Sequence, residues 1–128
     1  MEESTRIRVL IVDDHAVVRM GLRVFFDLQD DMEVVGEAAD GSEGVAMARR
    51  LAPDVVLLDP RIPAMNGGRA IIGCLRDAAP GVRVLVLNWS DAAGGGQPAG
   101  DADAYIKKTF RPHELIDAVV AAARTPIA

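Results

Sequence analysis

The stretch Pro53-Asp-Val-Val-Leu-Leu-Asp59 is a short apolar run that closes on a carboxylate. Residues 55–58 carry no polar side chain, which is typical of a strand buried on both faces of a parallel sheet. Pro53 ends any helix that precedes it, because proline lacks the backbone N–H that a helix needs. The stretch therefore predicts the central strand of an α/β sheet, with Asp59 at its carboxyl end.

The same pattern extends in both directions along the chain of 128 residues. Short runs rich in Val, Ile and Leu alternate with longer segments in which apolar residues recur every three or four positions, and this alternation is typical of a parallel sheet covered by helices. We expect one domain over residues 1–124, with 125–128 as the start of a linker. The predicted strands are residues 7–12, 33–38, 55–58, 82–87 and 104–107.

The first predicted helix follows Asp14, and its apolar residues recur at helical spacing. We expect this apolar face, like that of the last helix, to be mostly core. The residues that define it are Val17, Gly21, Phe25 and Leu28.

Three further helices complete the pattern. The second opens at Asp40, three residues before Glu43, which is the spacing of a helix cap, and runs to about residue 51. The third spans residues 67–78. The last begins at Pro112, because proline is favoured at the first helical position, and directs its apolar residues toward the core. These residues are Leu115, Ile116, Val119 and Val120.

Residues 90–100 interrupt the alternation where a further helix should lie. The segment reads Ser-Asp-Ala-Ala-Gly-Gly-Gly-Gln-Pro-Ala-Gly, with four glycines and one proline. At about 1 kcal/mol for each glycine and about 3 kcal/mol for proline, roughly 7 kcal/mol opposes an interior helix there. We expect a loop, or at most one helical turn, in place of the fourth helix of the fold.

Composition excludes several classes of protein. The formal net charge of −5 disfavours direct binding to the phosphates of nucleic acid, which requires a basic face. Cys74 is the only cysteine, so neither an intrachain disulfide nor a cysteine-rich zinc site is expected. The longest apolar runs are too short to span a membrane, and the first residues lack the apolar stretch of a signal peptide. We expect a soluble, cytoplasmic protein.

Polar residues follow the predicted strands at their carboxyl ends, which is where the functional groups of open parallel sheets gather. Clustered carboxylates repel one another unless a cation lies among them, and a hard divalent ion such as Mg²⁺ prefers oxygen ligands. A lysine beside them could balance the charge of a phosphoryl group. The residues at the strand ends are Asp13, Asp14, Asp59, Asn88 and Lys108.

Four motifs together resemble the receiver domain of NarL/FixJ-type (LuxR-type) response regulators of two-component systems. They are IVDDHAVVRMGL at residues 11–22, VVGEAADG at 34–41, PDVVLLD at 53–59 and AYIKK at 104–108, and the likeness spans almost the whole chain. The resemblance implies a flavodoxin-like (CheY-like), doubly wound sheet of five parallel strands in the order 2-1-3-4-5. It also implies a signalling domain rather than an enzyme, with phosphotransfer to Asp59 from a histidine kinase or a small phosphodonor.

The resemblance further assigns roles to the residues at the strand ends. Asp14, Asp59 and the backbone carbonyl of Arg61 would hold Mg²⁺, and Asp13 would reach it through water. Lys108 would contact the phosphoryl oxygens. These roles agree with the chemistry, because a carboxylate nucleophile needs cations to neutralise the phosphoryl charge.

The chain departs from the family pattern at its switch. Tyr105 matches the switch aromatic, but the usual threonine or serine is Asn88, whose amide is longer than a hydroxyl. Trp89 follows it, and its indole would either obstruct the phosphorylation pocket or cover apolar surface left by the missing helix; we favour the second role. Arg61 could also reach Asp59 as an ion-pair partner and take the place of the metal's charge.

Two mechanisms follow, and both place a helix-turn-helix output domain outside this chain, with transcription as the regulated process. In the first, phosphorylated Asp59 acts through a residual switch. In the second, which the departures favour, the receiver is atypical and works without phosphorylation, through constitutive dimerisation or a small ligand. With part of the usual output surface missing, a homodimer would form through the first and last helices.

Other interpretations of the same residues remain open at this point. Asp13 and Asp14 could merely cap the first helix. His15 and His113 have no metal-ligand spacing and are expected at the surface. A haloacid-dehalogenase-like phosphatase would need an aspartate where this chain has Arg61, and a flavodoxin would need a hydroxyl- and glycine-rich loop after the first strand.

Overall fold

The computed structural model describes residues 6–62, 70–88, 102–107 and 112–124. It contains a five-stranded parallel sheet in the order β2-β1-β3-β4-β5, which confirms the predicted flavodoxin-like topology. The three predicted strands at residues 7–12, 55–58 and 104–107 have the expected bounds, and the other two shift by one residue. The elements are β1 (Ile7–Val12), α1 (Ala16–Asp27), β2 (Met32–Ala38), α2 (Gly41–Leu51), β3 (Val55–Leu58), α3 (Ile71–Ala78), β4 (Arg83–Asn88), β5 (Ala104–Lys107) and α4 (Pro112–Arg124).

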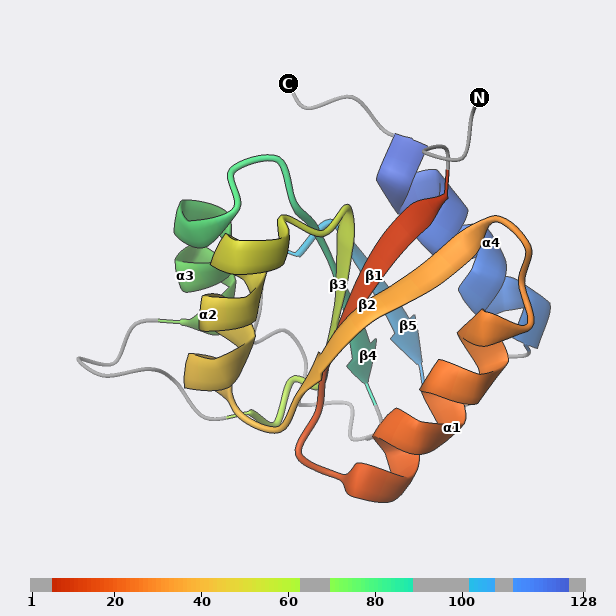
Figure 1. Ribbon diagram of the computed structural model, residues 1–128, viewed down its shortest axis with the longest axis horizontal. Coiled ribbons are helices and arrows are strands. Elements are labelled where there is room, and N and C mark those ends of the chain that lie inside the picture. The colour runs from red at the N-terminus through yellow and green to blue at the C-terminus, as the bar shows by residue number, and fades with distance from the viewer. Residues whose placement is uncertain (1–5, 63–69, 89–101, 108–111, 125–128) are drawn as a thin grey trace.

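Helices cover both faces of the sheet, with α1 and α4 on one side and α2 and α3 on the other (Figure 1). Each face has its own apolar core, because side chains alternate between the two faces along every strand. Val56 and Leu58 of β3 point into the α2–α3 core, while Val55 and Leu57 point into the α1–α4 core. All four are buried, as expected for a central strand.

The predicted core face of α1 is wrong for Val17, Gly21 and Leu28, which are exposed, whereas Phe25 packs against the core as expected. Val17 and Leu28 are 81% and 74% exposed, whereas Leu22 and Phe26 are buried. The helix is apolar around most of its circumference, so two stripes at helical spacing compete in the sequence, and packing against β1 and β2 selects the one that contains Phe26. The other stripe faces outward.

The start of α2 follows the sequence prediction. The Asp40 side chain accepts a hydrogen bond of 2.8 Å from the backbone N–H of Glu43, and the Glu43 side chain accepts one of 2.8 Å from the N–H of Ala39. The first bond satisfies an N–H group that the helix start leaves unpaired, and the second ties Glu43 back to the residue before the cap. In α3, by contrast, the described helix begins at Ile71, since Ala70 is extended and serves as its N-cap residue.

Several predictions fall on parts of the chain outside the described residues. They concern the glycine-rich loop at residues 90–100, the first residues of the third helix and the linker at 125–128. Within the described ranges, no helix has the length and apolarity that a membrane crossing would require.

Candidate functional site

Two buried carboxylates lie at the carboxyl edge of neighbouring strands. Val12, the last residue of β1, pairs with Leu58, the last residue of β3, so Asp13 and Asp59 leave the sheet side by side. Their backbone N–H groups continue the ladder, from Asp13 to the carbonyl of Ala38 at 3.0 Å and from Asp59 to that of Val12 at 3.0 Å. The side chains are only 3% and 0% exposed. The sheet itself therefore brings both carboxylates to one place.

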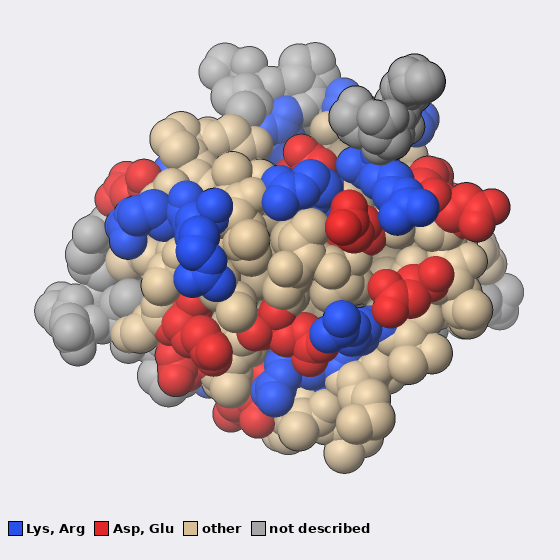
Figure 2. Space-filling model, in the orientation of Figure 1, with Lys and Arg blue, Asp and Glu red and all other residues tan. Residues whose placement is uncertain are grey.

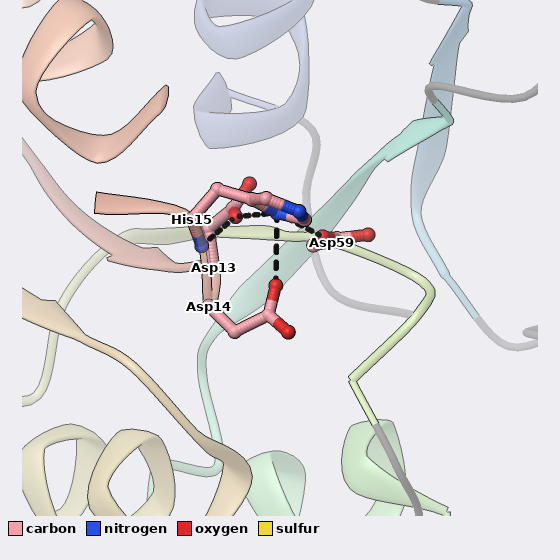
Figure 3. A group of neighbouring side chains, drawn as sticks. All are labelled: Asp13, Asp14, His15 and Asp59. Carbon is pink, nitrogen blue, oxygen red and sulfur yellow. Dashed lines mark hydrogen bonds and ion pairs between the residues drawn. The ribbon is translucent and has the colours of Figure 1, made fainter. Parts of the chain in front are cut away.

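Asp14 and His15 complete a cluster with these two residues. One ligand atom from each of Asp13, Asp14, His15 and Asp59 lies within 4.8 Å of the others, and Figure 3 shows their side chains converging. The Nδ1 atom of His15 lies 2.9 Å from an Asp14 oxygen, 3.2 Å from an Asp13 oxygen and 3.8 Å from an Asp59 oxygen. Asp14 and His15 are about half exposed, so the cluster opens to solvent on their side.

His15 is the site residue that sequence reasoning missed. It is a surface residue, as expected, but it also lies among three carboxylates. The signal was its position directly after the two aspartates, because a residue that starts a helix at the end of a strand stays beside that strand's last side chains. His15 is the N-cap residue of α1, with extended backbone and no side-chain cap hydrogen bond.

The structure does not support the interpretation that Asp13 and Asp14 merely cap α1. The Asp13 side chain accepts a 2.8 Å hydrogen bond from the N–H of His15, which precedes the first residue of the helix. Arg19 of α1 donates to the backbone carbonyl of Asp13 at 2.7 Å. Helix α1 thus holds the loop that carries Asp13, and the carboxylates stay in the cluster.

Arg61 contacts Asp59 and His15 of the cluster and is itself about half exposed. Its Nε lies 3.3 Å from Oδ1 of Asp59, and its Nη2 lies 3.3 Å from Oδ2 of the same residue and 3.3 Å from Nδ1 of His15. The ion pair expected from the sequence is therefore present. The hydrogen bond to Asp59, followed by the Coulomb attraction of that carboxylate, raises the pKa of the Arg61 guanidinium above its usual value.

The donor set fits a hard divalent cation. Three carboxylates bring three formal negative charges together, and among the described residues Arg61 is the permanent cation in contact with Asp59. Oxygen atoms dominate the set, as Mg²⁺ prefers, and the half-exposed Asp14 leaves room for the waters that this ion retains. The cluster is thus a candidate metal centre beside a buried carboxylate.

Comparison with known proteins assigns this chain to a family. The sequence model described as "Response regulator receiver domain" matches residues 9–120, most of the chain. The chain belongs to the response regulator receiver domain family. The transcriptional regulatory protein LiaR of Bacillus subtilis is 42% identical to this chain over 92% of the chain's residues. The nitrate/nitrite response regulator protein NarP of Escherichia coli is 36% identical over 97% of them.

Solved structures agree with this assignment. The signal receiver domain of the response regulator NarL from Mycobacterium tuberculosis has a TM-score of 0.79 and 30% identity, with 94% of this receiver domain and 98% of that chain covered. The receiver domain spans 56% of LiaR and 58% of NarP, a little over half the length of these curated relatives.

The remaining predicted site residues of the receiver domain are described only in part. Asn88 ends β4 and pairs with Lys107, and Tyr105 pairs with Val86, so the backbone brings both to the β4–β5 pair. Their side chains are not among the described parts, and Lys108 and Trp89 lie outside the described residues altogether. The roles assigned to these four residues stay predictions.

Proposed function

We propose that this chain is the signal receiver half of a transcription regulator and that Asp59 is its phosphoacceptor. The observation that carries the proposal is the fully buried Asp59 side chain at the carboxyl end of the central strand, within the cluster of Asp13, Asp14 and His15. LiaR and NarP extend well beyond the matched region, which supports a helix-turn-helix output domain outside this chain. A histidine kinase or a small phosphodonor would supply the phosphoryl group.

The chain's own residues would support phosphotransfer as follows. An Oδ atom of Asp59 forms a bond to phosphorus while the bond from phosphorus to the donor breaks, and the donor leaves with the electron pair. Asp14, Asp59 and the Arg61 carbonyl would hold Mg²⁺, with Asp13 acting through water, and the ion would neutralise phosphoryl charge. Lys108 would contact the phosphoryl oxygens, and Asn88 and Tyr105 would act as the switch residues that respond to phosphorylation of Asp59.

A phosphorylation-independent receiver is the second candidate, and one observation favours it. Arg61 already neutralises Asp59 in the structure, so the carboxylate has a partner without metal or phosphate. Together with Asn88 and Trp89 in place of the usual residues, this supports an atypical switch. Dimerisation or a small ligand would then carry the signal.

Incubation with Mg²⁺ and acetyl phosphate separates the two candidates. We expect the intact mass to increase by one phosphoryl group, and the increase to be absent in Asp59→Asn, which cannot form the acyl phosphate. Beryllofluoride, followed by ¹⁹F NMR, provides a second readout that does not depend on the lifetime of the acyl phosphate. Failure of the wild-type protein to take up either group would select the phosphorylation-independent mechanism.

A homodimer through α1 and α4 is proposed on the basis of the outward stripe of α1. Four large apolar side chains recur along this helix at spacings of three and four residues and are all exposed, from 57% to 81%. The same helix also lines an apolar groove of about 220 Å³ together with α4, and its lining residues include Gly21, Phe25 and Pro112. Exposed apolar surface of this kind marks interaction sites. The stripe consists of Val17, Met20, Val24 and Leu28.

Met20→Glu is expected to weaken this dimer by roughly tenfold or more, because a charge would be buried against apolar side chains. Sedimentation velocity over a range of protein concentrations measures the effect. Ala46→Glu, at an exposed position of α2 on the other side of the sheet, is the matched control and should not change the association. A wild-type protein that stays monomeric at every concentration would show that the stripe does not pair with itself.

Leu115 and Val119 of α4 are fully buried, so variants there would test the core instead.

The rest of the surface supports an indirect role in transcription. On the face drawn in Figure 2, basic and acidic side chains are interspersed, and no large patch of one sign covers it. With a net charge of −5, this domain is not expected to bind DNA itself. We also propose a cytoplasmic location, which is typical of response regulators.

A further inference from the structure

The side chain of Arg61 reaches over Asp59 because a short turn directs it there. The N–H of Ile62 donates to the carbonyl of Asp59 at 3.1 Å, and the N–H of Arg61 donates to Oδ1 of Asp59 at 2.9 Å. Asp59 and Ile62 are both buried, with 1% and 8% of their surfaces exposed. Pro60 and Arg61 lie between these two anchors, and Arg61 is left at the surface with its guanidinium beside the Asp59 carboxylate.

The contact engages both oxygens of the phosphoacceptor. Nε of Arg61 is the donor to Oδ1 and Nη2 is the donor to Oδ2, each at 3.3 Å. A phosphorylatable aspartate needs one oxygen for the cation and the other for attack on phosphorus, so a guanidinium on both oxygens competes with both steps. The arginine therefore competes for the atoms that the reaction uses.

The same contact is loose enough to be released. Both distances lie just beyond the usual range for N–H···O hydrogen bonds, about 2.7 to 3.2 Å, and the Arg61 side chain is 54% exposed. Water can therefore replace Asp59 as its partner at little cost. Rotation of the side chain alone would remove the guanidinium from both oxygens, while the backbone N–H of Arg61 would stay on Oδ1.

We propose that Arg61 is an internal gate on the phosphoacceptor, whose guanidinium occupies both oxygens of Asp59 at rest and competes there with a divalent cation. The inference rests on the proposed function in one respect, that a cation and a phosphodonor act at Asp59. Arg61 would then act on cation binding in two opposite ways. Its guanidinium would compete with the cation for Asp59, and its backbone carbonyl would serve as a ligand of the cation once the side chain has moved away. The strength of this contact would set how much Mg²⁺ the domain needs before it can be phosphorylated.

Titration of the metal alone tests the gate. Arg61→Gln keeps the backbone N–H and a polar side chain but removes the competing charge, and we expect it to bind Mg²⁺ or Mn²⁺ roughly fivefold more tightly by calorimetry. Arg50→Gln removes an exposed arginine from the end of α2, at the opposite edge of the sheet, and should change the affinity by less than about 1.5-fold. Equal or weaker binding in Arg61→Gln would overturn the gate.

A second readout follows the guanidinium itself. In ¹⁵N NMR of the metal-free protein, the Nε–H chemical shift of Arg61 is expected to report the contact with Asp59, and it should change in the same direction in Asp59→Asn and on addition of Mg²⁺. A chemical shift that is unchanged by saturating Mg²⁺ would also overturn the gate, because the cation would then bind without displacing the arginine.

The two proposals fail in different ways. If both proteins bind the cation alike and are phosphorylated at Asp59 alike, the gate is wrong and the proposed function stands. If neither protein binds the cation or takes up phosphate, the proposed phosphoacceptor fails, and the gate fails with it. If only Arg61→Gln binds the cation and is phosphorylated, the gate is supported in its strongest form, with the wild-type site held closed.

Discussion

Phe26→Ala is expected to lower the free energy of unfolding by about 3 to 5 kcal/mol, the usual range for removal of a fully buried phenylalanine. The ring is 0% exposed and lies in the core between α1, α4 and the sheet. Since domains are stable by only about 5 to 15 kcal/mol, this loss would remove a large part of the total. Urea denaturation followed by far-UV circular dichroism measures it.

Phe25→Ala is the matched control. Phe25 lies next to Phe26 in the chain, and the two rings meet edge to face with centroids 5.3 Å apart, but Phe25 is only partly buried. We expect a loss of about 1 to 2 kcal/mol there. Equal losses at the two positions would mean that α1 does not present the described face to the sheet. The outward stripe proposed for dimerisation would then be misplaced as well.

Asp13→Asn is expected to weaken Mg²⁺ binding by about 100-fold. Asp13 is buried in the cluster, and loss of even an outer-shell partner of a metal commonly reduces affinity by about 10- to 100-fold. At ten times its dissociation constant, Mg²⁺ should stabilise the wild-type protein by about 1.4 kcal/mol, and the same concentration should scarcely affect the variant. Thermal unfolding with and without Mg²⁺ gives the comparison.

Asp30→Asn controls for the change in net charge. Asp30 is exposed and precedes β2, at the edge of the sheet opposite to the cluster. Its substitution removes the same charge and should leave the effect of Mg²⁺ intact. If Asp13→Asn responded to Mg²⁺ as the wild-type protein does, the cation would be bound elsewhere or held without Asp13.

The sheet could be predicted from the sequence because its signal is local. A strand buried on both faces has an uninterrupted apolar run in its sequence, as in Val55–Leu58, and a polar residue directly follows this run. The convergence of Asp13 and Asp59 then follows from topology, since the carboxyl ends of neighbouring parallel strands meet at one edge. The prediction that Arg61 reaches Asp59 needed only a separation of two residues.

The features that the sequence did not predict depend on packing between distant segments. The choice between two apolar stripes on α1 is made by β1 and β2, because periodicity alone does not indicate which stripe contacts the sheet. His15 lies beside Asp13 and Asp14 because it follows them in the chain, but it comes within 3.8 Å of Asp59 only because β1 and β3 are neighbours in the sheet. Spacing rules for metal ligands do not detect a residue that three-dimensional proximity brings to the site.

His15 belongs to two parts of the molecule at once, as a member of the cluster and as the residue on which α1 begins. Arg19, one turn further along, also reaches back to the loop that carries Asp13. The helix with the outward apolar stripe is thus anchored at the carboxylates. If cation binding shifts that anchor, thermodynamic linkage makes the effect reciprocal: self-association would change the affinity for the cation by the same factor by which the cation changes self-association.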